Sequence, residues 1–367
     1  MRVVMLSKAL VVGAYQTKAV ALAAEPDIEL TVIVPAYWRE GADRLHLERD
    51  HVRGYDLVVA PMALNGNYHL HFYPTLGRLL RRLRPDLCHI DEEPYNLATW
   101  HALRAARGVG ARTVCFTWQN LHRRYPPPFR WLEQAVYRGA DAIIAGNHAA
   151  AQVLRNKGYA GPAPVIPQFG VDPKLFAPRP ASDQRPERPF TIGFAGRLIA
   201  DKGLLVLAEA LARLDGPWRL ALYGDGPLRE TLAARLAASG ERVAFHPRVP
   251  STAMPGVLAG LDAVVLPSLT RPNWMEQFGR VLIEAMACET PVVGSDSGEI
   301  PHVIGEAGLV IPEGDANALA AALARLRDEP GLALRLGRGG RARVLAHYTQ
   351  AQIAAQTAAV YREVLAG

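Results

Sequence analysis

The stretch from Glu276 to Gly298, EQFGRVLIEAMACETPVVGSDSG, decides the fold of the second half of the chain. Its first part is predicted to be a helix, and Pro291 to Gly294 a β-branched strand that ends in a polar turn. If the first part is one helix, Glu276 and Glu284 are separated by about 800° of rotation and lie on roughly the same side. The two carboxylates could then touch one ligand, or they could form an ordinary solvated face.

The start of this predicted helix offers a site for an anion. Gly279 stands where the helix is expected to begin, just after Glu276. The first backbone N–H groups of a helix have no partner within it, and they carry the positive end of the helix dipole. The stretch therefore places acids and free N–H groups where a hydroxylated, phosphorylated ligand could bind.

Outward from this stretch, both halves of the chain alternate strands and helices. The strands read as continuous apolar runs, which is typical of a parallel sheet covered on both faces. Two successive arrays of this kind predict an α/β protein of two Rossmann-like domains. The first half has expected strands at 2–6, 30–35, 55–61, 86–90, 112–118 and 140–146, with helices at 76–84 and 98–107; the second half begins with strands at 190–196 and 219–226.

Domain limits follow from length and from proline. A chain of 367 residues is too long for one ordinary core. The proline-rich section from Pro162 to Pro189 is the predicted linker, which gives domains at 1–175 and 176–349. The last helix, within 350–367, could join either domain.

The charge distribution limits the classes of partner, and the cysteines indicate the compartment. The net charge is +6, and all of the positive excess lies in the first half, which suggests a phosphorylated substrate, an anionic membrane surface or a nucleic acid, unless it is arginine-rich composition alone. No nucleic-acid motif is visible, so nucleic acid is the least favoured. Cys88, Cys115 and Cys288 read as buried thiols of a reducing compartment. Without a spanning apolar run, we expect a cytoplasmic protein, or one peripheral to the inner face of the membrane.

A second constellation lies between Gly196 and Gly203. Arg197 and Lys202 follow a predicted strand at a turn bracketed by these glycines. Two cations at the carboxyl end of a strand suit a diphosphate, although such a turn can also be a solvated loop. The next strand ends in a glycine turn, 224–227, to which we assign only a part in shaping the cleft.

In order and spacing, residues 190–349 resemble the retaining nucleotide-sugar glycosyltransferases of family four. The shared patterns are GRLxxxKG, GxGP, LPS, ExFGxxxxEAMAxxxPVVGSxxG and GLVxPxGD. In the first half the resemblance rests on domain layout and on the segment HIDEEPYN. It implies a GT-B fold, in which two Rossmann-like domains face each other across a cleft and the last helix crosses back to the first domain.

The resemblance also implies roles for residues of the second half. Arg197 and Lys202 would bind the diphosphate, Glu276 the hydroxyls of the donor sugar, and Glu284 the ribose; the first three form the implied catalytic set. The cations would take the place of Mg²⁺, so no metal site is expected. Further donor-binding residues would be Gly196, Arg248, Val249, Phe278, Gly279, Arg280 and Val281.

The sequence departs from the family pattern in two places. In the stretch 298–302 the acid expected there is shifted to Glu299, and His302 stands in its place. After the strand that ends at Thr117, a histidine found in many relatives is missing. Thr117, Gln119 or Asn120 could donate a hydrogen bond there, but none is a general base. Retaining transfer can let the departing diphosphate accept the proton, so activity is still expected.

The acceptor side is sought in the first half. Glu92 and Glu93 belong to an acidic run at the end of a strand, where ligands bind in such folds, although such a run is also typical of a solvated loop. Gly13, Tyr15 and Gln16 lie at the first strand's turn and could face the acceptor.

The segment 122–131 mixes cations with aromatic residues. It could lie on an anionic bilayer, bind an acceptor pyrophosphate, or be a packed surface loop.

The function predicted from these observations is a metal-independent, retaining glycosyltransferase without a separate cofactor. It would move a hexose-type sugar from a UDP- or GDP-sugar to a hydroxyl of a glycan or lipid-linked acceptor. The alternatives are a non-catalytic nucleotide-sugar sensor or scaffold, a related sugar epimerase, and a disaccharide synthase.

Overall fold

A computed structural model describes residues 1–41, 43–179 and 188–367. The chain divides into two compact units, which we call the first unit (Met1–Gly170 with Gln350–Gly367) and the second unit (Val171–Thr349). The predicted boundary after residue 175 falls inside the second unit. Residues 171–175 belong to the second unit because hydrogen bonds tie this stretch to it: Val171 N donates to Tyr348 O (2.9 Å), and Arg341 donates to Phe176 O (3.2 Å).

The first unit is built on a six-stranded parallel sheet in the order β5-β2-β1-β6-β7-β8. Alternate residues of β1 enter two different hydrophobic clusters, Val3 and Met5 one and Val4 and Leu6 the other, so both faces of the sheet are covered. The strands are β1 (Arg2–Leu6), β2 (Glu29–Val34), β5 (Asp56–Val59), β6 (Leu87–Ile90), β7 (Arg112–Thr117) and β8 (Ala142–Ala145). The helices are α1 (Thr17–Ala23), α2 (Leu76–Leu83), α3 (Leu97–Arg107), α4 (Phe129–Gly139), α5 (His148–Asn156) and α13 (Gln350–Ala366), with short 3₁₀ turns at Lys8–Val11 and Gly13–Gln16.

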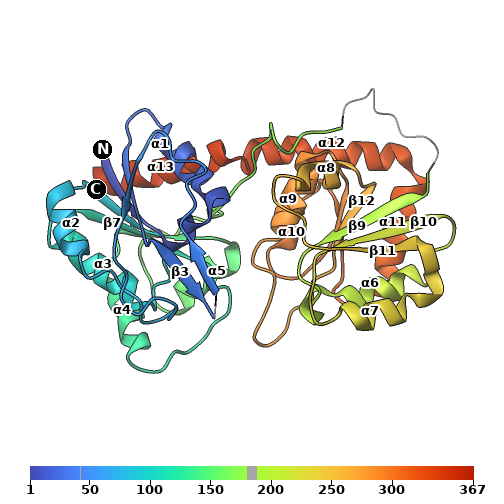
Figure 1. Cartoon of the computed structure of the whole chain (residues 1–367), viewed down its shortest axis with the longest axis horizontal. Helices are drawn as coiled ribbons and strands as arrows, with labels where there is room; N and C mark the ends of the chain where they lie inside the picture. The colour runs from blue at the N-terminus through green and yellow to red at the C-terminus, as the bar shows by residue number, and fades with distance from the viewer. Residues whose placement is uncertain (42, 180–187) are drawn as a thin grey trace. The chain divides into compact units, whose positions relative to one another are not determined.

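The second unit repeats this plan with the order β11-β10-β9-β12-β13-β14. Figure 1 shows α6 and α7 on one face of its sheet and α8 and α12 on the other. The strands are β9 (Phe190–Ala195), β10 (Trp218–Tyr223), β11 (Val243–His246), β12 (Ala263–Leu266), β13 (Val292–Ser295) and β14 (Leu309–Ile311). The helices are α6 (Leu204–Leu211), α7 (Arg229–Arg235), α8 (Met254–Ala259), α9 (Arg280–Ala287), α10 (Ile300–Ile304), α11 (Ala316–Asp328) and α12 (Pro330–His347), with 3₁₀ turns at Ala200–Lys202 and Ala237–Arg242.

Two Rossmann-like α/β units, each with a parallel sheet, confirm the predicted fold class. In each sheet the first strand, β1 or β9, has neighbours on both sides, and the chain winds away from it in opposite directions. In open α/β sheets ligands bind outside the carboxyl ends of the strands at such a reversal. This rule fixes where a site is to be sought in each unit, between β1 and β6 and between β9 and β12.

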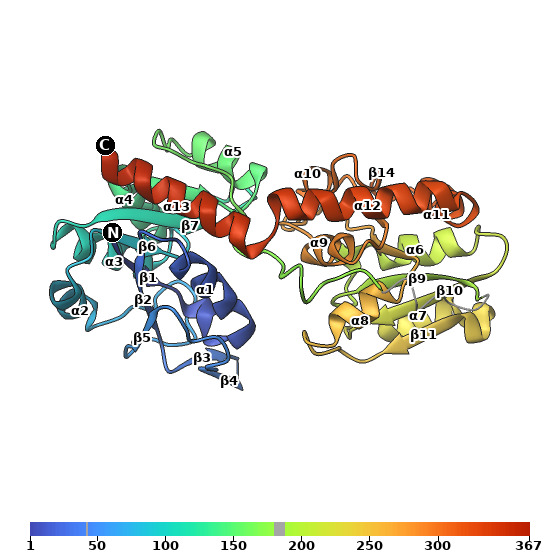
Figure 2. The same ribbon diagram turned by 90° about the horizontal axis from the view of Figure 1, so that it is seen from above.

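Helix α13 completes the first unit, although it is the last element of the chain (Figure 2). Its buried side chains Ile353 and Ala358 join the cluster that covers one face of the sheet. Tyr361 packs there too, and its hydroxyl contacts His89 Nδ1 of β6 at 2.5 Å. His89 is therefore a structural residue, as the apolar strand around it indicates.

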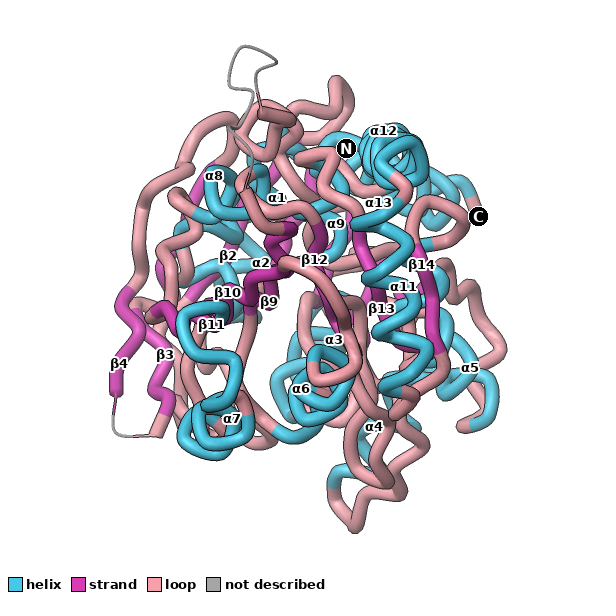
Figure 3. The backbone as a smooth tube through the Cα atoms, turned by 90° about the vertical axis from the view of Figure 1, so that its right-hand side faces the viewer, coloured by secondary structure: helices cyan, strands magenta, loops and turns pink. Residues whose placement is uncertain are grey.

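Three local features differ from the sequence prediction. An antiparallel hairpin of β3 (Tyr37–Glu40) and β4 (Asp43–His46), drawn apart from the large sheets in Figure 3, is not foreseen by periodicity. Part of the predicted linker belongs to the first unit, because Ile143 N and Ala145 N donate to the carbonyls of Pro162 and Pro164. Residues 180–187 of that linker lie outside the described residues.

In the described part of the chain, no helix is both long and apolar enough to cross a bilayer. The three cysteines are buried thiols, as predicted.

Candidate functional site

A cavity of 530 Å³ lies in the second unit at the carboxyl ends of β9 and β10. Six of its lining residues were predicted to bind the donor, so strand-end motifs far apart in the sequence meet at one place. Two of the six are exposed arginines, and among the described residues neither makes an ion pair. We call it the second-unit cavity; it is lined by Ala195, Gly196, Arg197, Tyr223, Gly224, Asp225, Arg248, Val249, Met254, Val281 and Glu284.

The glycine turn after β10 lets two strand ends approach closely. Gly224 has φ +137°, and a Cβ there would lie 2.1 Å from the carbonyl oxygen of Gly196. A side chain at this position would push the two turns apart, so the turn shapes the cavity floor as expected. Sequence reasoning missed Tyr223, whose ring stacks on His246 with centroids 4.6 Å apart. An aromatic residue just before a glycine turn was the available signal.

Glu284 enters the second-unit cavity from helix α9. Burial raises the pKa of this carboxyl, and the guanidinium of Arg280 opposes that shift. Arg280 lies one turn earlier on the same face, and its Nε contacts Glu284 Oε1 at 2.8 Å. The carboxylate is thus held in place with one side toward the cavity, where it can accept hydrogen bonds from hydroxyl groups.

The prediction that Glu276 and Glu284 share one helix is wrong. Gly279 adopts the left-handed conformation (φ +76°) and caps α9, which begins only at Arg280. Glycine adopts this conformation without a Cβ penalty, so the chain turns sharply here. Glu276 consequently lies in the loop before α9, and Phe278 is buried in the same loop.

Glu276 is paired with Lys202. Lys202 Nζ donates to Glu276 Oε2 at 2.5 Å, and Ser268 Oγ donates to the same oxygen at 2.8 Å. The Glu276 side chain is 9% exposed and that of Lys202 16%, so the pair is shielded from solvent. Lys202 also lies 5.1 Å from the centroid of the Trp274 ring. Of the two cations predicted to bind diphosphate, Arg197 lines the cavity, whereas Lys202 contacts a predicted sugar-binding carboxylate.

Two glycines hold this pair in position. Gly203 has φ +66°, and a Cβ there would lie 1.7 Å from Pro267 O. Gly298 has φ +54°, and a Cβ there would lie 2.1 Å from Glu276 O. Both glycines therefore pack directly on backbone: Gly203 holds the turn that carries Lys202 against Pro267, and Gly298 holds the turn after β13 against the loop that carries Glu276.

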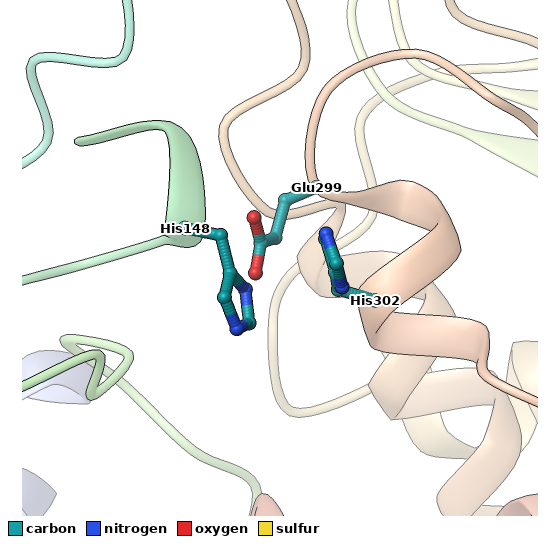
Figure 4. A group of neighbouring side chains, drawn as sticks. All are labelled: His148, Glu299 and His302. Atoms are coloured by element: carbon teal, nitrogen blue, oxygen red, sulfur yellow. The ribbon is translucent and has the colours of Figure 1, made fainter. Parts of the chain in front are cut away.

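The departure from the family pattern after β13 has a structural role. Glu299 N donates to Glu276 O at 3.2 Å, so this turn supports the Glu276 loop. Figure 4 shows Glu299 just before α10 and His302 within its first turn. The carbonyl of His302 accepts hydrogen bonds from Arg343 (2.6 Å) and Tyr348 (3.3 Å), which tie α10 to α12 and the residue that follows it.

A second cavity, of 270 Å³, lies in the first unit at the ends of β1, β6 and β7. We call it the first-unit cavity. Four of its lining residues are aromatic, and three are the acids that follow β6. Its lining consists of Lys8, Ala9, Val11, Val12, Tyr15, Trp38, Leu45, Asp91, Glu92, Glu93, Phe116, Trp118 and Gln168.

The acids that follow β6 do not form a solvated loop. Asp91 is 5% exposed and Glu92 3%. Lys18 Nζ lies 3.1 Å from Asp91, and Lys8 pairs with Glu92. Ser7 Oγ also donates to Asp91 at 2.6 Å.

These contacts decide the ionisation of the two acids. Burial alone would raise the pKa of Asp91, but the charge of Lys18 and its hydrogen bonds lower it to about 2. Burial alone would also raise the pKa of Glu92, but its interactions with Lys8 and His71 lower it to about 2. Both acids are therefore fully ionised at neutral pH.

Glu93 differs from its neighbours because, among the described residues, it makes no ion pair. Its Oε2 accepts a hydrogen bond from Thr117 Oγ1 at 2.6 Å, and its Oε1 accepts one from Trp118 N at 2.8 Å. Burial is the largest influence and raises the pKa of Glu93 to about 7. Glu93 thus stands at the end of β7, beside the position where a histidine was expected and is missing.

Of the remaining acceptor-side candidates, some line the first-unit cavity and others only stabilise the structure around it. Tyr15 lines the first-unit cavity, whereas the Gln16 amide donates to the carbonyls of Leu10 (3.1 Å) and Glu48 (2.6 Å). Gly13 packs so closely on Asp50 that a Cβ would lie 2.2 Å from its carboxylate. These two residues stabilise the turn after β1 and do not line the cavity.

The candidates after β7 also differ in whether they contact the cavity: Thr117 does so through Glu93, whereas Gln119 and Asn120 do not line it. The Gln119 amide, oriented to satisfy both partners, bridges Glu133 (3.2 Å) and Lys157 (2.8 Å). Asn120 is buried.

The basic segment 122–131 borders a separate cavity of 380 Å³ in the first unit. Its cations are Arg123, Arg124, Arg130 and Lys157, and Lys157 is paired with Glu133 at 2.6 Å. The segment leads into α4, on which Trp131 is 66% exposed.

Comparison with known proteins identifies the family of the chain. The family described as Glycosyltransferase Family 4 matches residues 17–175, and the family described as Glycosyl transferases group 1 matches residues 189–329. The chain is 31% identical over 338 residues, 85% of each protein, to the GDP-mannose-dependent alpha-(1-6)-phosphatidylinositol monomannoside mannosyltransferase of Mycolicibacterium smegmatis.

Other relatives are matched over less of their length. The MMP alpha-(1->4)-mannosyltransferase of Mycolicibacterium hassiacum is 32% identical over 66% of this chain and 60% of its own. The alpha-maltose-1-phosphate synthase of Mycolicibacterium smegmatis is 30% identical over 64% of this chain and 66% of its own. The chain therefore spans slightly less than two thirds of the length of these two relatives.

Solved structures share the fold over the whole chain. Sucrose-phosphate synthase from Thermosynechococcus elongatus has a TM-score of 0.72 at 22% identity and covers 100% of this chain and 99% of its own. A glycosyltransferase from Rickettsia africae has a TM-score of 0.77 at 17% identity and covers 99% and 98%. The chain therefore has the GT-B fold of these glycosyltransferases. The chain belongs to glycosyltransferase family four.

Proposed function

We propose that the protein moves a hexose from a UDP- or GDP-sugar to a hydroxyl of a glycan or lipid-linked acceptor, with retention of configuration and without a metal ion. The observation that carries the proposal is the second-unit cavity, in which Arg197 and Arg248 share one 530 Å³ space with Glu284. Cations suited to a diphosphate and a carboxylate suited to hydroxyl groups are the two chemistries that a nucleotide sugar requires.

Each group has a part in holding the donor. Arg197, at the turn after β9, would donate to the diphosphate oxygens, and Glu284 would accept hydrogen bonds from the ribose hydroxyls. Arg248 and Val249, after β11, would border the base, with the ring of Tyr223 on the same wall. These positions follow from the order of strands β11, β10 and β9 across the sheet.

The pair Lys202–Glu276 would serve the reacting end of the donor. Glu276 would accept hydrogen bonds from hydroxyls of the transferred sugar, while Lys202 would stabilise the negative charge that grows on the departing diphosphate. Cations fixed in place do the work that Mg²⁺ does elsewhere, which supports metal-independent transfer. In the retaining reaction the departing diphosphate takes the proton of the acceptor hydroxyl.

The acceptor side is proposed to lie in the first unit. A relative named for a phosphatidylinositol monomannoside makes a lipid-linked acceptor and GDP-mannose the first candidates to test. A cytoplasmic protein held at the inner face of the membrane fits that acceptor, with the basic segment 122–131 as the contact. Cytoplasmic location and membrane contact are both parts of the proposal.

The deciding experiment is a donor screen with purified protein in EDTA. UDP- and GDP-sugars are tested for thermal stabilisation and for slow hydrolysis of the donor, with wild type, Arg197→Ala and the control Arg219→Ala. Arg219 is exposed on β10 and does not line the cavity. We expect one donor to stabilise and be consumed by wild type and the control, and Arg197→Ala to lose about 100-fold in turnover. Binding without consumption, even with candidate acceptors present, would favour the sensor; loss of turnover in EDTA would refute metal independence.

A further inference from the structure

The first-unit cavity combines aromatic walls with the carboxylate of Glu93. Tyr15, Trp38, Phe116 and Trp118 line it, and Tyr15 is held in place by stacking on Phe169 with centroids 4.4 Å apart. The apolar C–H face of a sugar or cyclitol ring packs well on such rings. The wall therefore suits a ring that has an apolar face and a polar rim.

The neighbouring acid Glu92 is closed off from the cavity by its protein partners. Lys8 binds its Oε2, and His71 Nε2 lies 3.5 Å from its Oε1. The Glu92 side chain is 0% exposed. Glu93, which is partly exposed and lines the cavity, is therefore the acid that a ligand there can contact.

Glu93 supplies the acceptor and sets the sign of the cavity's charge. The charges of Asp91 and Glu92 are balanced by Lys18 and Lys8, whereas Glu93 accepts hydrogen bonds from a hydroxyl and a backbone N–H and makes no ion pair within the described part of the chain. When Glu93 is ionised, the cavity carries one uncompensated negative charge, which repels a phosphate group.

We propose, on the basis of the function proposed above, that the first-unit cavity binds an uncharged polyhydroxyl ring of the acceptor and that Glu93 determines this specificity by accepting a hydrogen bond from a ring hydroxyl. A phosphate or pyrophosphate of the acceptor is thereby excluded from this cavity. The aromatic walls hold the face of the ring.

The proposal includes a dependence on pH. Each oxygen of Glu93 accepts one hydrogen bond and keeps one further lone pair. A proton added to the carboxyl takes one of these two remaining positions and removes the negative charge that strengthens a hydrogen bond from the ring. Because the pKa of Glu93 is raised to about 7, binding should weaken as pH falls from 8 to 6. The other charged or titratable groups around Glu93 are Lys8, Glu92 and the phenols Tyr95, Tyr125 and Tyr137.

Ligand-observed NMR titrations of the full chain test the proposal. The probes are methyl α-D-mannopyranoside and myo-inositol, each compared with its phosphorylated counterpart, mannose 6-phosphate and myo-inositol 1-phosphate. At pH 8 we expect the uncharged probes to bind about tenfold more tightly, and Glu93→Gln to remove both this preference and the pH dependence. Glu29→Gln, an exposed carboxyl on β2, is the control and should change nothing.

Three results would overturn the inference: no binding of either uncharged probe, equal or tighter binding of the phosphorylated probes, or unchanged selectivity in Glu93→Gln. Binding of UDP and GDP is measured on the same samples and reports on the second-unit cavity. Loss of nucleotide binding in wild type would refute the proposed function. Normal nucleotide binding with any of the three results above would refute this inference alone.

Discussion

The two cavities lie at the carboxyl edges of two sheets of the same topology, each beside the first strand of its sheet, yet their charged groups are arranged in opposite ways. In the second unit, the cations Arg197 and Arg248 are exposed at the cavity and make no ion pair among the described residues. In the first unit, the cations Lys8 and Lys18 form ion pairs with buried carboxylates. The acid Glu93 makes no ion pair among the described residues. One site is suited to an anion and the other to neutral hydroxyl groups.

The difference teaches that topology fixes where a ligand binds and strand-end side chains fix which ligand. Both cavities lie at the carboxyl ends of the strands and beside the first strand of their sheet, the first-unit cavity toward β6 and the second-unit cavity toward β10. The residues at these strand ends are then free to differ, because the strands behind them are held by buried apolar side chains in both units. The predictions below alter the groups that make the two cavities differ.

The largest expected effect is on stability, from Lys18→Met. Removal of this cation leaves Asp91 buried without its ion pair, which should cost about 3 kcal/mol or more of unfolding free energy. Urea denaturation measures it. The matched control is Arg2→Met, which breaks a pair with Asp86 whose side chains are 49% and 40% exposed and should cost about 1 kcal/mol or less. Equal losses in the two variants would contradict the importance of the buried pair.

Next in size is a catalytic effect of Glu276→Gln. The variant keeps the shape of the side chain but leaves Lys202 without its carboxylate, and we expect turnover of the donor to fall about 100-fold. Affinity for UDP or GDP alone should change little, because Glu276 would contact the sugar. Steady-state kinetics and calorimetry on the same samples separate the two effects. A variant that loses nucleotide affinity and keeps its turnover would show that the pair serves the diphosphate.

A third test compares the pH dependence of stability in wild type and Glu93→Gln. The pKa of Glu93 in the folded protein is raised to about 7, so the folded state binds this proton more tightly than the unfolded state does. Its contribution is present below the unfolded pKa of about 4.5 and is lost as pH rises to 7, amounting to about 3 kcal/mol or less.

Wild type should therefore lose stability relative to Glu93→Gln between pH 5 and pH 8. Urea denaturation at each pH gives the difference. His89, whose pKa burial lowers to about 3, titrates alike in both proteins and cancels. A difference that does not change with pH would mean that Glu93 is ionised throughout this range.

The smallest expected effect concerns the basic segment 122–131. The double reversal Arg123→Glu with Arg124→Glu should weaken binding to vesicles containing anionic lipid by about 30-fold or more, since each of the two cations near such a surface contributes about 1 kcal/mol. Reversal of Arg335 and Arg338, exposed on α12 of the second unit, is the control. Co-sedimentation at low and physiological salt measures both. If the first variant binds like wild type, the segment is a packed loop without a membrane contact.

The second-unit site was more readable from the sequence than the first because its determinants are local. Arg197 stands next to a glycine turn, and Glu284 lies on a helix that the apolar pattern reveals. The sharp break at Gly279 was missed, because a helical pattern does not show which glycine adopts a positive φ.

In the first unit the burial of Asp91 and Glu92 depends on Lys18, Lys8 and Gln168, which are distant in the sequence. Only the folded sheet brings these partners together, so an acidic run could not be told from a solvated loop. The β3–β4 hairpin, which supplies Trp38 to the cavity wall, carries no clear alternation either.

Helix α13 affects the order in which the two units can fold while the chain is being synthesised. The apolar cluster over one face of the first sheet lacks Ile353, Ala358 and Tyr361 until the last 17-residue helix has been made. The second unit is continuous in sequence from Val171 to Thr349 and can close its own core before that moment. The part of the chain that is synthesised first is therefore the part completed last, and its half-covered sheet must be kept from aggregating while the rest of the chain emerges.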